Sequence, residues 1–126
     1  MSIEPGLWGE ADVVVCEADT AIAFGSGDVP VLATPRVIAL CEQAACAAIE
    51  GHLRPGETSV GMRVQLDHLA PTGIGGKAKA EATLDKVEGR RLTFTVSVSD
   101  ARGLIAAGKV TRVVVDVERF LDKAAE

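Results

Sequence analysis

The segment between Thr34 and Gly51 constrains the fold most, because it is apolar around most of a helix. At about 100° per residue, only Arg36, Gln43 and Glu50 fall together as a polar stripe. We predict a helix of about 16 residues that Thr34 caps, with proline at its first position and Gly51 after its end. A helix with so little polar surface must be wrapped by other elements.

Segments with the alternating pattern of half-buried strands supply that wrapping. The clearest has leucine, phenylalanine and two valines at alternate positions of 92–98. Alanines at 78, 80 and 82 form a similar row, small enough to let a sheet approach the helix closely. Turns at 88–90 and 100–103 join the later strands into an antiparallel meander. The predicted strands are 11–18, 58–69, 78–85, 92–99 and 104–118.

Five antiparallel strands with one long buried helix after the first strand predict the hotdog fold, an α+β arrangement in which the sheet curls around the helix. No repeat, low-complexity tract or long linker interrupts the chain, so residues 1–126 are expected to form a single domain. Such a sheet has open edges, and three Phe, one Trp and no Tyr are few aromatics for closing a core. We therefore expect a homodimer with the same surface of each copy in contact across a two-fold axis.

Composition and charge exclude several classes of function. A net charge of −5 and a pI near 5.0 argue against nucleic-acid binding, which needs a basic face and aromatic platforms. The apolar runs are too short to span a membrane, and residues 1–10 lack the features of a signal peptide, so a cytoplasmic protein is expected. The three cysteines have no Cys-x-x-Cys spacing, so we expect free thiols, no metal and no cofactor.

Glu42 is an unusual residue for its place on the predicted helix. It lies about 100° from Gln43 and so leaves the polar stripe. A carboxylate in an apolar cleft is the kind of group that serves as a general base. The alternative is a glutamate on the flank of the helix that reaches solvent or a second subunit. The residues alone leave both interpretations open.

His68 ends a row of alternate apolar residues, Val60, Met62, Val64 and Leu66, and is therefore expected to point inward. An imidazole in this position is compatible with two roles. One is catalysis, and the other is that of a core histidine bonded to the backbone.

Thr34 and Gly61 also have two interpretations each. Capping accounts for Thr34, but its hydroxyl lies beside free backbone N–H groups that can hold a carbonyl oxygen. Gly61 lies inside a predicted strand, which marks either a bulge or a close approach of the backbone to a ligand. Cys41 and Cys46 face an apolar helix surface, so we expect both to be buried rather than nucleophilic.

Several motifs cover nearly the whole chain after residue 10. They are the spacing of Thr34 and Glu42, Pro55-Gly56-Glu57 followed by Gly61, Asp67-His68, Ala70-Pro71-Thr72-Gly73, Glu88-Gly89-Arg90-Arg91-Leu92, and Gly108 to Arg112. In this combination the chain resembles the fluoroacetyl-CoA thioesterase family of hotdog proteins.

The resemblance implies hydrolysis of an acyl-CoA thioester to free acid and coenzyme A, with Thr34, Glu42 and His68 as the catalytic group. It also implies a backbone contact from Gly61 to the acyl carbonyl and support of the site by Arg112. A thiol leaves readily, so the reaction needs an activated nucleophile and a stabilised oxyanion more than an acid. We expect Glu42 to attack the carbonyl or activate water, and His68 to move protons. Thr34 and the Gly61 amide would then hold the oxyanion.

The acyl group is expected to be small, and not necessarily fluoroacetyl. The fluoroacetate-selective member of the family has a phenylalanine-lined lid before the helix, and here Gly25 and Asp28 lie where lid aromatics would be. The phosphates of coenzyme A need basic partners. The candidates are Arg36, Arg90, Arg91 and Lys109.

Two other functions are compatible with these residues. One is a hotdog enoyl-CoA hydratase or dehydratase, which also uses an acid–base pair but leaves the thioester intact. The other is a non-catalytic acyl-CoA-binding module, in which Glu42 is a flank residue and His68 a core residue. Release of free thiol from an acyl-CoA distinguishes hydrolysis from both.

Overall fold

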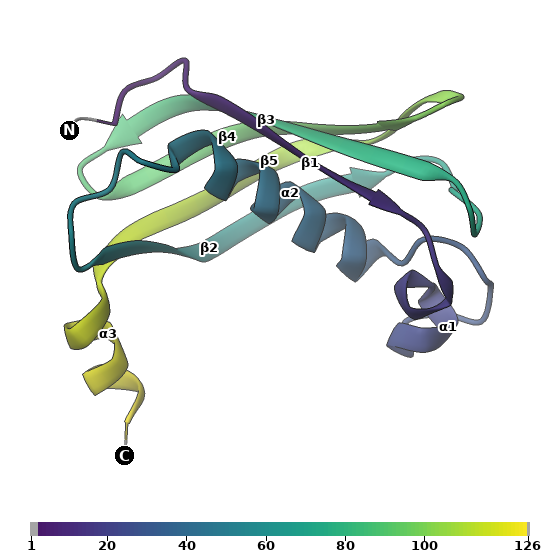
Figure 1. The fold of residues 1–126 in the computed structure, drawn as a ribbon, viewed down its shortest axis with the longest axis horizontal. Helices are drawn as coiled ribbons and strands as arrows, with labels where there is room; N and C mark the ends of the chain where they lie inside the picture. The colour runs from purple at the N-terminus through teal and green to yellow at the C-terminus, as the bar shows by residue number, and fades with distance from the viewer. Residues whose placement is uncertain (1–2, 126) are drawn as a thin grey trace.

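The structure, a computed structural model, describes residues 3–125 (Figure 1). Strands and one long helix dominate it, as the sequence predicts. The elements in chain order are β1 (Trp8–Val14), η1 (Glu17–Asp19), α1 (Ala21–Phe24), α2 (Thr34–Ile49), β2 (Glu57–His68), β3 (Lys77–Glu88), β4 (Arg91–Asp100), β5 (Gly103–Asp116) and α3 (Val117–Ala124).

The strands form one antiparallel sheet in the order β1-β3-β4-β5-β2. The sheet curls around α2, which lies on its concave side between the edge strands β1 and β2 (Figure 1). This is the predicted hotdog arrangement of the α+β class. Helix α1 lies at the end of the molecule where α2 begins, and α3 projects from the opposite end (Figure 1).

The inner side of α2 packs against a row of small residues of the sheet. Seven helix side chains are buried, and Ala78, Ala80 and Ala82 of β3 are also fully buried, as the sequence predicts. Strand β1 approaches the helix most closely at Gly9, where a Cβ would collide with the Ala48 amide nitrogen. Small side chains therefore decide how tightly the sheet closes on the helix.

The predicted strand 11–18 is shifted, because the observed β1 ends at Val14. The Val15 amide donates to the Gly76 carbonyl, and the Cys16 amide donates to the Asp19 carboxylate at 2.9 Å. That second hydrogen bond is also the main cause that holds the pKa of Asp19 below its usual 3.8. A local carboxylate cap thus turns the chain out of the sheet into η1.

The predicted strand 104–118 is too long, because β5 ends at Asp116 and α3 follows. The Asp116 side chain accepts a hydrogen bond from the Arg119 amide at 3.0 Å and so caps the helix. The expectation for the helix cysteines is half right. Cys41 is buried, which raises the pKa of its thiol to about 12, whereas Cys46 is exposed.

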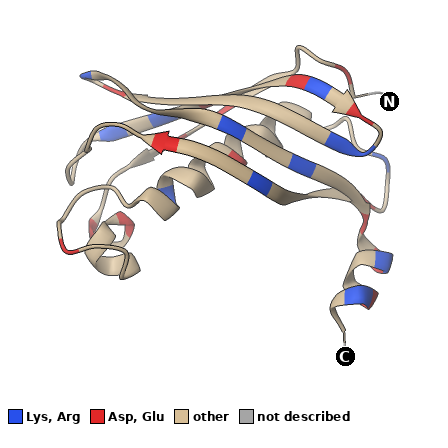
Figure 2. Cartoon of the chain, turned by 180° about the vertical axis from the view of Figure 1, so that it is seen from behind, with Lys and Arg blue, Asp and Glu red and all other residues tan. Residues whose placement is uncertain are grey.

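The outer face of the sheet is polar and carries charges of both signs (Figure 2). Between β1 and β3, Lys79 pairs with Glu10 at 3.0 Å and Lys77 with Asp12 at 3.6 Å. Such exposed pairs contribute little to stability. Of the helices in residues 3–125, none has the length and hydropathy needed to cross a membrane.

Candidate active site

Thr34 and His68 meet at the start of α2. The Thr34 Oγ1 and the His68 Nδ1 are joined by a hydrogen bond of 2.8 Å. The helix begins at Thr34 itself with Ala33 as its N-cap, so the predicted capping role of Thr34 is wrong. Its hydroxyl is instead directed to an imidazole at the end of β2, 34 residues further along the chain.

The environment of His68 favours a neutral imidazole. Burial lowers the pKa of His68 below its usual 6.5, and the Ala70 backbone opposes this only in part. The Nε2 atom is buried and has no hydrogen-bond partner among the described residues. When Nδ1–H donates to the threonine hydroxyl, Nε2 keeps the free lone pair that a general base needs.

Glu42 lies on the same helix and has a different partner. Its Oε2 accepts a hydrogen bond from Arg112 Nη1 at 2.9 Å. The Arg112 side chain is 9% exposed and the Glu42 side chain 32% exposed, so the carboxylate still reaches the surface. Ser59 holds the other end of the guanidinium, with its hydroxyl at 2.9 Å from Nε and its carbonyl at 2.8 Å from Nη2.

Gly61 makes room for this carboxylate. A Cβ at Gly61 would collide with Glu42 Oε2 and lie 3.7 Å from Arg112 Nη1. The register of β2 against β5 also shifts between Gly61 and Arg63, so the bulge that the glycine suggested is present. The bulge breaks the predicted row of Val60, Met62 and His68. On either side of the bulge, strand β2 turns Gly61 and then the alternate residues Val64, Leu66 and His68 toward the concave side.

Within one chain the predicted site residues form two groups. Thr34 and His68 make one, and Glu42, Arg112 and Gly61 make the other. Eight residues along a helix separate Thr34 from Glu42, a rise of about 12 Å. Each group borders its own hollow, of about 310 Å³ beside Thr34 and His68 and about 480 Å³ beside Glu42 and Arg112.

The family model described as fluoroacetyl-CoA-specific thioesterase matches residues 15–118 of this chain. The chain belongs to this thioesterase family. A fluoroacetyl-CoA thioesterase of Streptantibioticus cattleyicolor is 36% identical over 96 residues, which are 76% of this chain and 69% of that protein.

Solved structures agree with this membership in the thioesterase family. A structure of the fluoroacetyl-CoA thioesterase FlK has a TM-score of 0.91 and 32% identity, covering 98% of this chain and 96% of its own. A thioesterase superfamily member of Thermus thermophilus has a TM-score of 0.89 and 26% identity, covering 98% of this chain and 91% of its own. The five-stranded sheet and its helix are thus similar to those of known thioesterases.

Two backbone contacts hold the segment of this family member that carries Thr34. The Ala33 amide donates to the Asp19 carbonyl at 2.9 Å, and the Asp19 carboxylate pairs with Arg36 at 3.0 Å. The Leu32 amide donates to the carbonyl of Thr72 at 2.8 Å. Thr34 is therefore fixed from both sides before it meets the imidazole.

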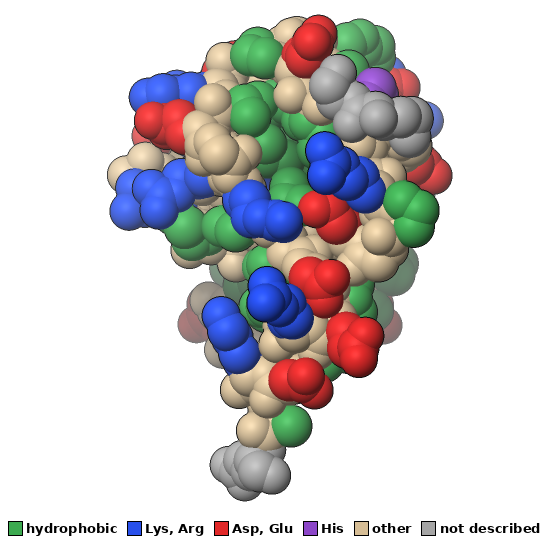
Figure 3. All heavy atoms as spheres, turned by 90° about the vertical axis from the view of Figure 1, so that its left-hand side faces the viewer, with side chains coloured by type: hydrophobic (Ala, Val, Ile, Leu, Met, Phe, Trp, Pro, Cys, Tyr) green, Lys and Arg blue, Asp and Glu red, His purple; other side chains and the backbone are tan. Residues whose placement is uncertain are grey.

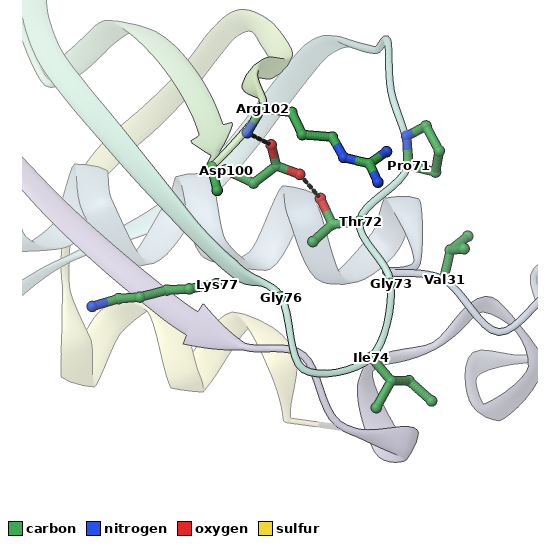
Figure 4. A pocket seen from close by; sticks show the side chains of 10 residues that line it. Val31, Pro71, Thr72, Gly73, Ile74, Gly76, Lys77, Asp100 and Arg102 are labelled. Atoms are coloured by element: carbon green, nitrogen blue, oxygen red, sulfur yellow. Dashed lines mark hydrogen bonds between the residues drawn. The ribbon is translucent and has the colours of Figure 1, made fainter.

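Thr72 is itself anchored on the loop that follows His68 (Figure 4). Its hydroxyl donates to Asp100 Oδ2 at 2.7 Å, while the Arg102 amide donates to Oδ1 at 2.8 Å. The Thr72 hydroxyl is the main cause that holds the pKa of Asp100 below its usual 3.8. This anchor ties the loop to the turn between β4 and β5.

Sequence reasoning missed Ser59, Asp19, Thr72 and Asp100 as parts of the site. Ser59 follows ordinary strand residues, and nothing in its spacing links it to residue 112. Thr72 was present in a family motif, but its partner Asp100 lies 28 residues away. In residues 3–125, no three His, Cys, Asp or Glu side chains are grouped so that they could hold a metal ion.

The candidate residues for the coenzyme A phosphates differ in whether they already form ion pairs within the chain. Arg36 is paired with Asp19, and Arg90 Nη1 lies 3.3 Å from Glu57 Oε2. Arg91 and Lys109 are exposed. Figure 3 shows the end of the molecule that carries α3, where basic side chains lie among acidic and apolar ones rather than in one basic patch. Contact with the phosphates stays a prediction for all four.

Proposed function

We propose that the protein hydrolyses an acyl-CoA thioester to a free acid and coenzyme A. The observation that carries this proposal is the hydrogen-bonded pair of Thr34 and His68, 2.8 Å apart in the lining of a hollow, in a chain of a thioesterase family. The acyl group is proposed to be small and is not restricted to fluoroacetyl.

The roles of the catalytic group follow from the chemistry of a thioester. In one route Glu42 attacks the carbonyl carbon, the C–S bond breaks, and water then hydrolyses the acyl–Glu42 anhydride to the free acid. In the other route Glu42 activates a water that attacks the carbonyl carbon directly, and in both routes the sulfur leaves as the thiol. His68, kept neutral by burial, takes a proton from the nucleophilic water and returns one to the leaving sulfur. Thr34 and the Gly61 amide hold the oxyanion, and Arg112 orients Glu42.

We propose that two copies of the chain complete the site between them. Strand β2 is an edge of the sheet, so its outer hydrogen-bonding groups are free to pair with a second β2. Gly61 lies beside Glu42, and His68 is the last residue of the strand. A two-fold axis that crosses β2 midway between these two residues therefore places Gly61 of one copy opposite His68 of the second. Glu42 of one copy then faces Thr34 and His68 of the second.

The experiment that tests both proposals is thiol release from acyl-CoA by single variants and by their mixture. We expect Glu42→Gln and His68→Ala each to lose activity. When the two are unfolded and refolded together, half of the dimers contain one copy of each, and one of their two sites has both native residues. We expect about a quarter of the native activity in the mixture. An inactive mixture contradicts the shared site, and an intact thioester with the native protein contradicts hydrolysis.

Two further points are proposals of the same kind. We propose that residues 1–126 act as a single domain, which the one sheet and one core support. We also propose that the enzyme works in the cytoplasm. Cys16, Cys41 and Cys46 are free thiols, which is typical of a reducing compartment.

A further inference from the structure

The hollow beside Thr34 and His68 has a lining that bears on which acyl group it suits. Its volume is about 310 Å³, and its wall comes from two parts of the chain that are distant in sequence. One includes Ala21 of α1 and residues between 26 and 34 that lead into α2, and the other is His68 at the end of β2 with residues 69–71. Thr34 and His68 thus lie together on the wall of this open hollow.

This hollow is larger than a two-carbon acyl group needs. Its volume falls within the range of about 300–1,000 Å³ that is typical of small-molecule sites. An acetyl group has only three heavy atoms and would leave most of the space to water. A longer acyl chain that fills the hollow removes more apolar surface from water.

The wall is mainly aliphatic. Val29, Val31, Leu32, Leu69 and Pro71 contribute to it. Val29 is 51% exposed and Leu69 61% exposed, so both present apolar surface to the hollow. An aliphatic acyl chain is the part of the substrate that matches this wall.

Asp28 adds a negative charge to the same lining. Among the described residues it has no ion pair, no Lys or Arg lines the hollow, and Arg36 at the start of α2 is engaged by Asp19. A substrate carboxylate in the hollow would therefore meet a like charge and no cation to balance it.

We propose that the site takes small uncharged aliphatic acyl groups of four or five carbons, straight or branched, and discriminates against acyl groups that end in a carboxylate. This inference rests on the proposed thioester hydrolysis. It assigns the hollow lined by residues 21–34 and 68–71 as the acyl chamber of that reaction.

A series of acyl-CoA substrates tests the size of the chamber. With acetyl-, propionyl-, butyryl- and isobutyryl-CoA, kcat/KM should rise about fourfold for each added methylene that the chamber buries. A series that is flat, or that is best with acetyl- or fluoroacetyl-CoA, overturns this inference and leaves the hydrolysis in place. No thiol release from any acyl-CoA overturns the proposed function, and this inference with it.

A variant that fills the chamber locates the binding place. Ser26 is an exposed lining residue, so Ser26→Phe should fold normally and shift the preference toward shorter acyl groups. Thr83→Phe, on the outer face of β3, is the matched control and should leave the preference unchanged. An unchanged preference in Ser26→Phe shows that the acyl group lies elsewhere and overturns the assignment.

The proposed discrimination against acyl groups that end in a carboxylate is tested with two substrates of similar length, valeryl-CoA and succinyl-CoA. The native protein should prefer valeryl-CoA, and Asp28→Asn should reduce that preference by about three- to fivefold. Asp122→Asn changes the net charge equally but lies in α3, at the far end of the molecule (Figure 1), and should have no effect. A preference that Asp28→Asn does not change overturns the role of this carboxylate.

Discussion

Ser59 holds Arg112 at two points, accepting from Nε at 2.9 Å with its hydroxyl and from Nη2 at 2.8 Å with its carbonyl. The remaining Nη1 donates to Glu42 at 2.9 Å. A buried guanidinium with partners on all three nitrogens has one orientation. Ser59 therefore determines where Arg112 presents its charge to the Glu42 carboxylate.

Replacing Ser59 with alanine should impair catalysis through Arg112. The buried Nε loses its acceptor, which should lower the free energy of unfolding by about 1–3 kcal/mol. With Glu42 less firmly oriented, kcat should fall about tenfold while KM stays close to native, a loss of about 1.4 kcal/mol in the transition state. Ser59→Thr keeps the hydroxyl and should restore kcat. Thr58→Ala, at the neighbouring position, is the control, and equal kcat values for it and Ser59→Ala would contradict the role.

Replacing Gly61 with alanine should abolish most of the activity without unfolding the protein. The added methyl group takes the place of the Glu42 carboxylate, which must turn away from Arg112. We expect kcat/KM to fall by about a hundredfold or more, in the range of losses seen when a positioned catalytic group is displaced. Gly73→Ala has no atom within 4 Å of the new Cβ and should remain active. Circular dichroism and a thiol-release assay separate misfolding from misplacement.

The pH dependence of activity should report on His68. Burial holds the pKa of this imidazole below 6.5, so the neutral form persists into mildly acidic solution. A plot of kcat/KM against pH should fall on the acid side with a midpoint below 6.5. His52→Gln should keep this limb. A midpoint above 6.5 in the native protein would contradict the assignment of His68 as the base.

The same residue should make stability depend on pH. Its folded-state pKa is below the unfolded value, so the unfolded chain binds more protons and the free energy of unfolding falls as the pH drops below 6.5. Urea unfolding of the native protein and His68→Gln at several pH values measures this. The variant should show the smaller decrease, and parallel curves would show that His68 does not contribute.

Replacing Gly9 with alanine should loosen the contact between β1 and α2. The new Cβ would collide with the backbone of the helix at Ala48, which cannot move aside as a side chain can. We expect the free energy of unfolding to fall by about 1–3 kcal/mol, the usual effect of overpacking. Gly73→Ala again provides the control in urea unfolding. Equal stability of the two variants would show that β1 adapts.

Local patterns were sufficient to predict the sheet and its helix. In the strand at 92–98, burial repeats at every second residue, and in α2 it repeats at every helical turn. Both repeats are visible in the sequence. Errors occurred where a single side chain interrupts the pattern. The Asp19 carboxylate ends β1 early, and Asp116 starts α3 where the valine-rich run appeared to continue as strand. A single side-chain hydrogen bond of this kind does not produce a repeating pattern in the sequence.

What the sequence determined by itself is therefore the class of fold, the buried helix and the identity of Thr34, Glu42, His68, Gly61 and Arg112 as residues of interest. Only the tertiary structure decided which of them meet. It directed Thr34 to His68 instead of to its own helix end, and it joined Glu42 to Arg112 across 70 residues and Arg112 to Ser59 across 53. Periodicity follows from local burial, whereas these contacts depend on strand register and on the bulge at Gly61, which no nearby residue encodes.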